Sequence, residues 1–269
     1  MEPVLLSREE CKQIQVNILV EVARICKENG LKYCLAYGTL LGAVRHKGFI
    51  PWDDDIDIFL MREDYEKLAE IMKEKKDCEW LDYVDGSNSL NYYYPFAKAV
   101  DNRTLAKQVD NHTEHGIWVD IFPLDTVPLD EKRCASFLRR NQFLRNWILA
   151  MTTDFSKPAH VNKFFAKFIL NLLAILVGKE RLYHYTIKYN KKYVGKNTGF
   201  VACLSTPYVK KERMEKNKLS ETVDLPFENV FFSAPKEWDW YLKKLYGDYM
   251  QLPPEDKRKT HQMIAWKIR

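Results

Sequence analysis

The sequence lacks the cysteine patterns of a zinc-binding or disulfide-built protein. Its six cysteines are widely spaced, none forms a Cys-x-x-Cys pair, and none combines with a histidine at zinc-ligand spacing. The 269 residues also contain no internal repeat and no low-complexity linker. With 46% hydrophobic and 29% charged residues, the composition excludes a disordered or fibrous chain. We therefore expect a globular protein with reduced structural thiols and a sizeable core.

Long apolar segments are missing as well. The first ten residues hold no basic group followed by an apolar run, so we expect no secretory signal and a cytoplasmic location. The most apolar segment, residues 164–177, is too short for a bilayer crossing, which takes about 20 apolar residues. Two alternatives remain for it: a helix buried in the core, which is the commoner outcome, or a helix lying in the membrane interface.

Acidic residues are scarce in one part of the chain. The net charge is only +5, but residues 155–218 carry 14 Lys or Arg against 3 Asp or Glu, whereas the rest of the chain carries 28 against 34. Such a stretch attracts nucleic acid or anionic lipid about as often as it forms a merely solvated face. We expect no nucleic-acid partner. A peripheral contact with the inner face of the cell membrane stays open for this region.

In the first half, apolar periodicity and capping signals predict alternating helices and strands. The expected elements are a helix over residues 7–29 that opens with the capping box Ser7-x-x-Glu10, a strand over 33–37, a helix over 39–45, a strand over 55–60 and a helix over 62–75. Further strands are expected over residues 92–100, 104–109 and 117–122, the last ended by Pro123.

From about Asp130 the pattern is helical through Val194 and mixed afterwards. We therefore expect an α/β (α+β) protein. Residues 1–129 form a catalytic core around a mixed sheet, and residues 130–269 form a mainly helical part that packs against this core and faces a membrane in one alternative.

Four carboxylates crowd into one short segment. It holds Asp53, Asp54, Asp55 and Asp57 immediately before and inside an apolar strand, where their repulsion is costly without a cation. Side chains two apart on a strand share a face, so Asp55 and Asp57 can both reach one Mg²⁺ or Mn²⁺. Asp120, in a second apolar strand, can complete this metal site. The alternative is an ordinary acidic turn.

A strand-to-helix turn precedes these aspartates. Gly38 and Thr39 offer backbone amides and a hydroxyl that can hold a phosphate at a helix N-terminus. Arg45 and Lys98 are candidate cations for charge that develops on a phosphate. A simple turn and ordinary surface cations are the alternatives. The order, with the turn before the aspartates, is the one that nucleotidyltransferase folds use.

Residues 37–57, from Tyr37-Gly-Thr to Asp-Asp-Asp-Ile-Asp57, resemble the signature of the LicD family, to which the fukutin-type proteins are related. The similarity continues through residues 94–98, 115–125, 225–228 and 246–250 and to a late histidine, His261. Most of the chain is covered, and the middle helices are the least specific part.

The resemblance implies a nucleotidyltransferase-like enzyme that transfers phosphocholine from CDP-choline to a sugar hydroxyl of a cell-surface glycan. The acceptor would be a lipid-linked teichoic acid or lipopolysaccharide precursor. In that reaction Asp55 and Asp57 would hold Mg²⁺ on the diphosphate, and Asp120 would position or deprotonate the attacking hydroxyl. Gly38 and Thr39 would bind phosphate oxygens.

Two other functions stay open. The same metal site suits a nucleotidyltransferase that modifies a small acceptor, and the sequence does not decide between the two transferred groups. The basic stretch and residues 164–177 would also suit a non-catalytic membrane-surface adaptor. Against the adaptor, the chain keeps all three of Asp55, Asp57 and Asp120 in their motif positions.

Overall fold

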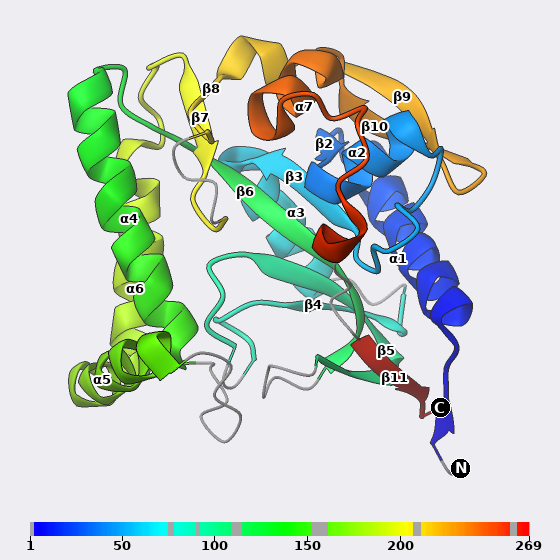
Figure 1. Ribbon diagram of the computed structural model, residues 1–269, viewed down its shortest axis with the longest axis horizontal. Helices are drawn as coiled ribbons and strands as arrows, with labels where there is room; N and C mark the ends of the chain where they lie inside the picture. Colours follow the sequence, from blue (N-terminus) through cyan, green and yellow to red (C-terminus); the bar gives the residue numbers. More distant parts are fainter. Residues whose placement is uncertain are drawn as a thin grey trace.

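The structure is a computed structural model that describes residues 3–74, 78–89, 92–108, 115–151, 161–206, 211–258 and 263–268. These residues form a mixed α/β fold around one large sheet (Figure 1). The α-helices of the described part are α1 (Arg8–Glu28), α2 (Tyr37–Arg45), α3 (Arg62–Glu74), α4 (Glu131–Met151), α5 (Val161–Val177), α6 (Lys179–Asn190) and α7 (Trp238–Tyr246).

The main sheet has nine strands in the described part of the chain. They are β1 (Val4–Leu5), β2 (Tyr33–Leu35), β3 (Asp57–Met61), β4 (Leu81–Val84), β5 (Ala97–Gln108), β6 (His115–Thr126), β7 (Phe200–Cys203), β8 (Met214–Glu215) and β11 (Met263–Lys267). A separate hairpin joins β9 (Thr222–Phe227) to β10 (Val230–Pro235). The expected α/β fold with a mixed sheet is confirmed.

The strand order brings the predicted site residues together. The central path of the sheet is β1-β11-β5-β6-β3-β2, with β4 beside β5 and β7 beside β6. β3 and β6 run parallel, and β5 pairs antiparallel with β6. In this register Asp120 pairs with Asp57 on one side and with Lys98 on the other. Three neighbouring strands therefore carry these three side chains at one level of the sheet.

The helix predicted over residues 7–29 is present as α1 and packs against β5 and β6 of the sheet. The capping box is present, because the Ser7 hydroxyl accepts from the Glu10 backbone N–H while the Glu10 carboxylate accepts from the Ser7 backbone. The apolar stripe of α1 is fully buried at Ile18, Leu19 and Val22. Burial of such a stripe, at about 25 cal/mol per Å² of apolar surface, stabilises the helix on the sheet far more than helix propensity does.

Several boundaries in the first half differ from the sequence prediction. The strand expected over residues 55–60 begins at Asp57 and runs to Met61, so Asp55 precedes it. The strand expected over residues 33–37 ends at Leu35, and α2 begins at Tyr37, which takes the left-handed value φ = 42°. The strand expected to stop at Pro123 continues to Thr126. A proline removes only the one hydrogen bond that its N–H would donate, and the residues on both sides of Pro123 stay paired with β3.

β5 was expected as two strands and is one. It runs through residues 97–108 with a register shift between Asp101 and Ala106 where it pairs with β6. Opposite the shift, a Cβ on Gly116 would lie 1.9 Å from the carbonyl oxygen of Asp101, so only glycine lets the two backbones approach this closely. Val109, the expected end of the second strand, lies outside the described residues.

The second half contains the expected helices, α4, α5 and α6. It also contributes β7, β8 and β11 to the main sheet, so strands from both halves of the chain share one sheet. No helix in the described ranges is long and apolar enough to cross a membrane.

The core alternative for residues 164–177 is wrong. α5 packs on α4 and α6 through a narrow side, where Ala174 is fully buried and the indole N–H of Trp147 donates to the Leu170 carbonyl at 2.7 Å. Most of its other large apolar side chains are exposed, up to 82% at Leu176. The side chain of Phe164 lies outside the described residues.

Candidate active site

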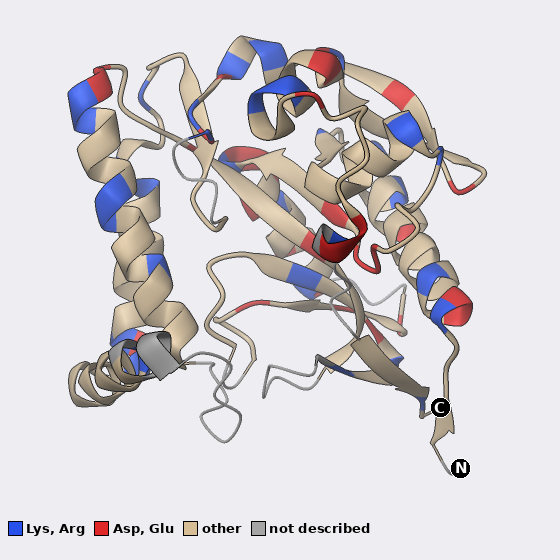
Figure 2. Ribbon diagram, in the orientation of Figure 1, with Lys and Arg blue, Asp and Glu red and all other residues tan. Residues whose placement is uncertain are grey.

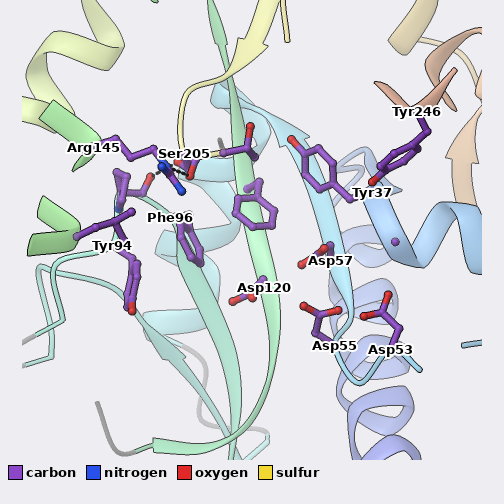
Figure 3. A pocket seen from close by; sticks show the side chains of 15 residues that line it. Tyr37, Asp53, Asp55, Asp57, Tyr94, Phe96, Asp120, Arg145, Ser205 and Tyr246 are labelled. Carbon is purple, nitrogen blue, oxygen red and sulfur yellow. Dashed lines mark hydrogen bonds between the residues drawn. The ribbon is translucent and has the colours of Figure 1, made fainter. Parts of the chain in front are cut away.

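A cavity of about 390 Å³ opens between the sheet and α4, and the predicted carboxylates line it. Its walls come from α2, β3 and the segment before it, β6, the segment before β5, α4, the segment after β7 and α7 (Figure 3). The lining residues are Tyr37, Gly38, Asp53, Asp55, Asp57, Tyr94, Pro95, Phe96, Asp120, Phe122, Arg145, Leu149, Ser205, Thr206 and Tyr246.

The centre of the site is a row of charges across three strands. Lys98 on β5 donates to Oδ1 of Asp120 on β6 at 2.5 Å, and both side chains are largely buried. The Lys98 ammonium also lies 4.1 Å from the centroid of the Trp118 ring. Burial lowers the pKa of Lys98, although the nearby carboxylates oppose this shift. Lys98 lies beside Asp120 and two strands away from Asp57, and it is not among the residues that line the cavity. Its phosphate contact stays a prediction.

Negative charge accumulates at the start of β3. Burial, followed by the charges of Asp57, Asp53 and Asp120, raises the pKa of Asp55 well above its usual value. Burial and the charges of Asp120 and Asp53 do the same for Asp57, while Lys98 opposes the shift. Burial is the largest cause of both pKa shifts, and repulsion among the carboxylates adds to it. A bound cation would relieve this repulsion.

The donor set suits a hard divalent cation. Carboxylate oxygens are the ligands that Mg²⁺ and Mn²⁺ prefer. Within the described residues no three acidic, histidine or cysteine side chains are already gathered into a closed metal-binding group. Mg²⁺ characteristically takes one or two protein carboxylates and completes its shell with water and substrate phosphate. The pair Asp55 and Asp57 fits this open mode, and Asp120 lies on the neighbouring strand.

Backbone contacts hold the acidic segment in place. The Arg8 guanidinium donates to the Asp53 carbonyl at 3.0 Å, and the buried Gln15 amide donates to the Asp54 carbonyl at 3.0 Å. Both donors lie on α1, so this helix positions the segment that carries the carboxylates. Sequence reasoning missed these two residues because they occupy polar positions of an amphipathic helix, which are usually solvated.

The turn residues Gly38 and Thr39 have different places. Gly38 lines the cavity, and a Cβ there would lie 2.5 Å from Oδ2 of Asp53, so a larger residue would displace this carboxylate. Thr39 is 3% exposed, and its hydroxyl accepts from the Asp57 backbone N–H at 2.8 Å. Thr39 therefore fixes the first residue of β3. A phosphate contact for either residue stays a prediction.

Arg45 does not line the cavity. Its guanidinium donates to the His46 ring at 2.9 Å and to the Tyr249 carbonyl at 2.6 Å, which ties the end of α2 to the segment after α7. Its predicted phosphate contact is untested. Among the described residues, the cation that lines the cavity is Arg145 of α4, whose Nε donates to the Ser205 carbonyl at 2.8 Å (Figure 3).

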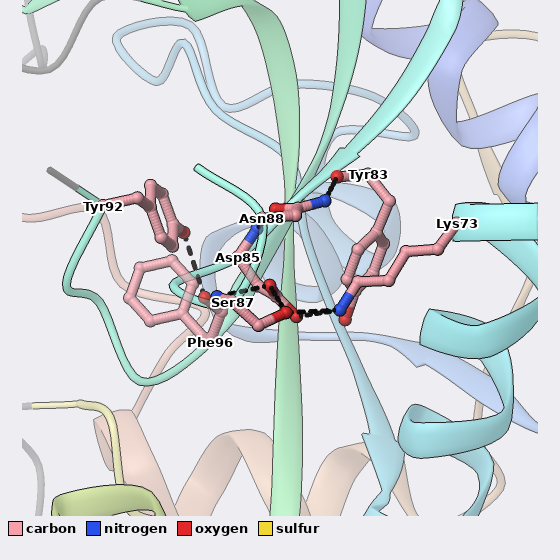
Figure 4. A network of polar contacts seen from close by, with 7 residues as sticks. All are labelled: Lys73, Tyr83, Asp85, Ser87, Asn88, Tyr92 and Phe96. Carbon is pink, nitrogen blue, oxygen red and sulfur yellow. Dashed lines mark hydrogen bonds and ion pairs between the residues drawn. The ribbon is translucent and has the colours of Figure 1, made fainter. Parts of the chain in front are cut away.

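Aromatic rings also line the cavity. Phe96 packs against Phe122 with ring centroids 4.6 Å apart and against Tyr94 at 5.3 Å, and Tyr37 meets Phe122 edge-on at 5.6 Å. Tyr92 supports this wall from behind, because its hydroxyl donates to the Phe96 carbonyl at 3.0 Å (Figure 4). The faces of such rings attract cations.

A polar network anchors the segment that leads to this wall. Lys73 of α3 bonds to both Asp85 and Ser87 at 2.8 Å, and Asn88 donates back to the Tyr83 carbonyl (Figure 4). These contacts fix the turn after β4. This turn is therefore tied to α3.

The buried Glu212 connects two residues that line the cavity, Tyr37 and Thr206. Oε1 of Glu212 accepts from the Tyr37 hydroxyl at 3.1 Å and from the Thr206 hydroxyl at 2.7 Å, and Glu212 is 1% exposed. Its Oε2 has no hydrogen-bond partner among the described residues. Burial raises the pKa of Glu212 to about 7. The protonated form is therefore favoured in the folded protein below this pH.

Glu212→Gln is expected to stabilise the protein at about pH 8 and to change its stability little at about pH 4. The folded pKa is raised from 4.5 to about 7, so the stability that the neutral side chain provides is present below 4.5 and is lost as the pH rises through 7. Glutamine imitates the neutral form, and the gain should be on the order of 2 kcal/mol. Denaturant unfolding at both pH values measures it. Glu215→Gln, at an exposed position of β8, is the control, and equal effects at both pH values would contradict the prediction.

The mixed sheet, with carboxylates from adjacent strands around one cavity, is the arrangement of a nucleotidyltransferase-type domain. Residues 30–163 match the family described as LicD/FKTN/FKRP, nucleotidyltransferase domain. The chain belongs to the LicD family. All of the predicted site residues lie within the matched range.

Among curated proteins, the chain is similar to the lipopolysaccharide cholinephosphotransferase LicD of Haemophilus influenzae. The two are 27% identical over 268 residues, which cover 96% of this chain and 97% of the relative. An uncharacterized protein of Rickettsia prowazekii is 38% identical over 78 residues, covering 26% of this chain and 29% of its own, and one of Rickettsia typhi is 42% identical over 59 residues, covering 22% and 19%. The Haemophilus protein is thus similar along nearly the whole chain.

Proposed function

We propose that this protein transfers phosphocholine from CDP-choline to a sugar hydroxyl of a cell-surface glycan, a lipopolysaccharide or teichoic acid precursor. The observation that carries the proposal is the composition of the cavity. Carboxylates suited to a metal-bound diphosphate and aromatic rings suited to a quaternary ammonium line the same cavity. The similarity to a cholinephosphotransferase over the whole chain supports the same assignment.

The chain's own residues provide positioning and charge. Asp55 and Asp57 would hold Mg²⁺ or Mn²⁺ against the diphosphate, and this cation, when bound, neutralises phosphate charge. Arg145 would contact the phosphate from the α4 side of the cavity. Tyr94 and Phe96 would receive the trimethylammonium head, a contact estimated at about 0.5 to 2 kcal/mol per ring.

The acceptor hydroxyl would approach beside Asp120. Its oxygen attacks the choline-bearing phosphorus, the bond from that phosphorus to the cytidine monophosphate oxygen breaks, and cytidine monophosphate leaves. Lys98 holds Asp120 at 2.5 Å, which fixes the carboxylate that orients the hydroxyl and takes up its proton. Gly38 leaves room for Asp53 at the edge of the site.

Product analysis with doubly labelled CDP-choline tests the proposal. One label is placed in choline and the other in cytidine, and the acceptor is a glycan with free sugar hydroxyls. We expect the choline label to enter the glycan and the cytidine label to appear as cytidine monophosphate. Entry of the cytidine label into the acceptor would favour the nucleotidyltransferase alternative. If neither label moves at any divalent cation concentration, the transferase proposal is wrong.

A further inference from the structure

α5 presents a wide apolar face that the rest of the described protein leaves uncovered. Eight large apolar side chains between Phe165 and Val177 are at least 42% exposed, with Leu176 the most exposed at 82%. A soluble surface usually scatters such residues singly, and a contiguous group marks an interaction surface. Because these residues recur around most of the helix, only the narrow side with Ala174 remains for α4 and α6.

The charged residues around this apolar face indicate what kind of partner it would bind. α5 itself contains no acidic residue, and the exposed side chains of Lys167 and Arg181 lie on it and just after it. Figure 2 shows α5 almost without charged residues at one corner of the molecule, beside α4, which carries several basic ones. The face is therefore apolar in its middle, and at its margin Lys167, Lys179 and Arg181 outnumber the exposed Glu180.

This pattern fits an anionic lipid surface better than a second copy of the chain. Two copies that met through α5 would bring their basic margins together, and like charges side by side are unfavourable. A helix of 17 residues with an apolar face and cationic neighbours suits a position in the plane of the membrane interface, with its apolar side chains among the lipid tails.

We propose that α5 is a membrane-surface anchor that docks this protein on anionic bilayers. The anchor comprises the exposed apolar side chains of residues 165–177 with Lys167 and Arg181. It does not depend on the donor or the acceptor of the transfer reaction. It packs on α4, the helix that supplies Arg145 and Leu149 to the cavity, so docking would hold the cavity close to the lipid surface.

Vesicle co-sedimentation of the full chain tests the anchor. We expect binding to vesicles of phosphatidylglycerol mixed with phosphatidylcholine at low salt, release at high salt, and little binding to phosphatidylcholine alone. The double variant Leu172→Asp, Leu176→Asp should bind at least about tenfold more weakly with an unchanged melting temperature, because both side chains are exposed.

Phe231→Asp is the matched control, because Phe231 is 67% exposed but lies on β10, outside the anchor. This variant should bind vesicles like the original protein. The anchor is refuted if the unmodified protein ignores anionic vesicles at low salt, or if the double variant binds them equally well. A dimer in light scattering that the double variant converts to a monomer, without vesicle binding, would assign the face to a second copy instead. None of these results depends on phosphocholine transfer.

Discussion

Asp57→Asn is expected to lower kcat for phosphocholine transfer on the order of 10²- to 10³-fold or more while leaving the protein folded. Asparagine keeps the size of the side chain but removes the negative charge that would hold the metal ion against the diphosphate. Burial, followed by the charges of Asp120 and Asp53, raises the pKa of Asp57, so the charged form of this side chain is unfavourable in the folded protein. Removal of the charge should therefore keep or raise the melting temperature, as active-site charges are often retained at the expense of stability.

Asp54→Asn provides a matched control. Asp54 belongs to the same acidic segment but does not line the cavity. Its loss should change kcat by much less, and chelation of divalent cations should inhibit both the original protein and this variant. Near-normal turnover in Asp57→Asn, or full activity after rigorous chelation, would overturn the assignment of the metal site.

Arg62→Met is expected to destabilise the protein by about 3–5 kcal/mol, which corresponds to a fall in melting temperature of roughly 10 °C. Arg62 opens α3 and donates twice to Asp125 near the end of β6, with both distances at 2.7 Å. The two side chains are only 6% and 0% exposed. Loss of the guanidinium leaves a buried carboxylate without its cation, and this penalty exceeds the value of the contact itself.

Two further measurements separate the ion pair from simple packing. Burial already raises the pKa of Asp125 despite Arg62, and without Arg62 this pKa rises further. The destabilisation caused by Arg62→Met should therefore shrink at acid pH, where Asp125 is protonated in both the folded and the unfolded protein. The double variant Arg62→Met, Asp125→Leu should recover most of the loss, because no buried charge remains. A double variant as unstable as the single one would show that packing dominates.

The sequence predicted the part of the site that lies on one short segment and its partner strand. Period-two alternation predicted that Asp55 and Asp57 share one face of a strand, but β3 begins at Asp57 and Asp55 lies in the segment before it. Both side chains line the cavity, as does Asp120, whose strand was marked by bulky neighbours. The structure then shows Asp57 and Asp120 paired across β3 and β6. The ends of the helices and strands were harder to predict. α2 begins at Tyr37, which connects it to β2 through a left-handed backbone conformation that tyrosine rarely adopts.

The remaining site residues were beyond the reach of local patterns. Arg145 sits in an amphipathic helix like any solvated arginine, and only the packing of α4 beside the sheet turns it into the cavity. Arg45 shows the reverse, because its place beside the motif suggested a phosphate contact while the fold brings the Tyr249 carbonyl to it. For residues 164–177, hydrophobicity predicted a helix correctly, but whether a neighbour covers it depends on tertiary structure alone.

The position of β11 has a consequence for the order in which a nascent chain can fold. β11 lies between β1 and β5 and pairs with residues 104–108 of β5, whereas β4 closes the other half of β5 at residues 98–101. β4 precedes β5 closely in the chain, so the half that carries Lys98 can acquire its neighbours early. Residues 104–108 of β5 can pair with β11 only after the ribosome has added residues 263–267. Pairing between such distant segments is slow. Translation would therefore assemble the charged row before it completes the edge of the sheet that joins the first strand to the last.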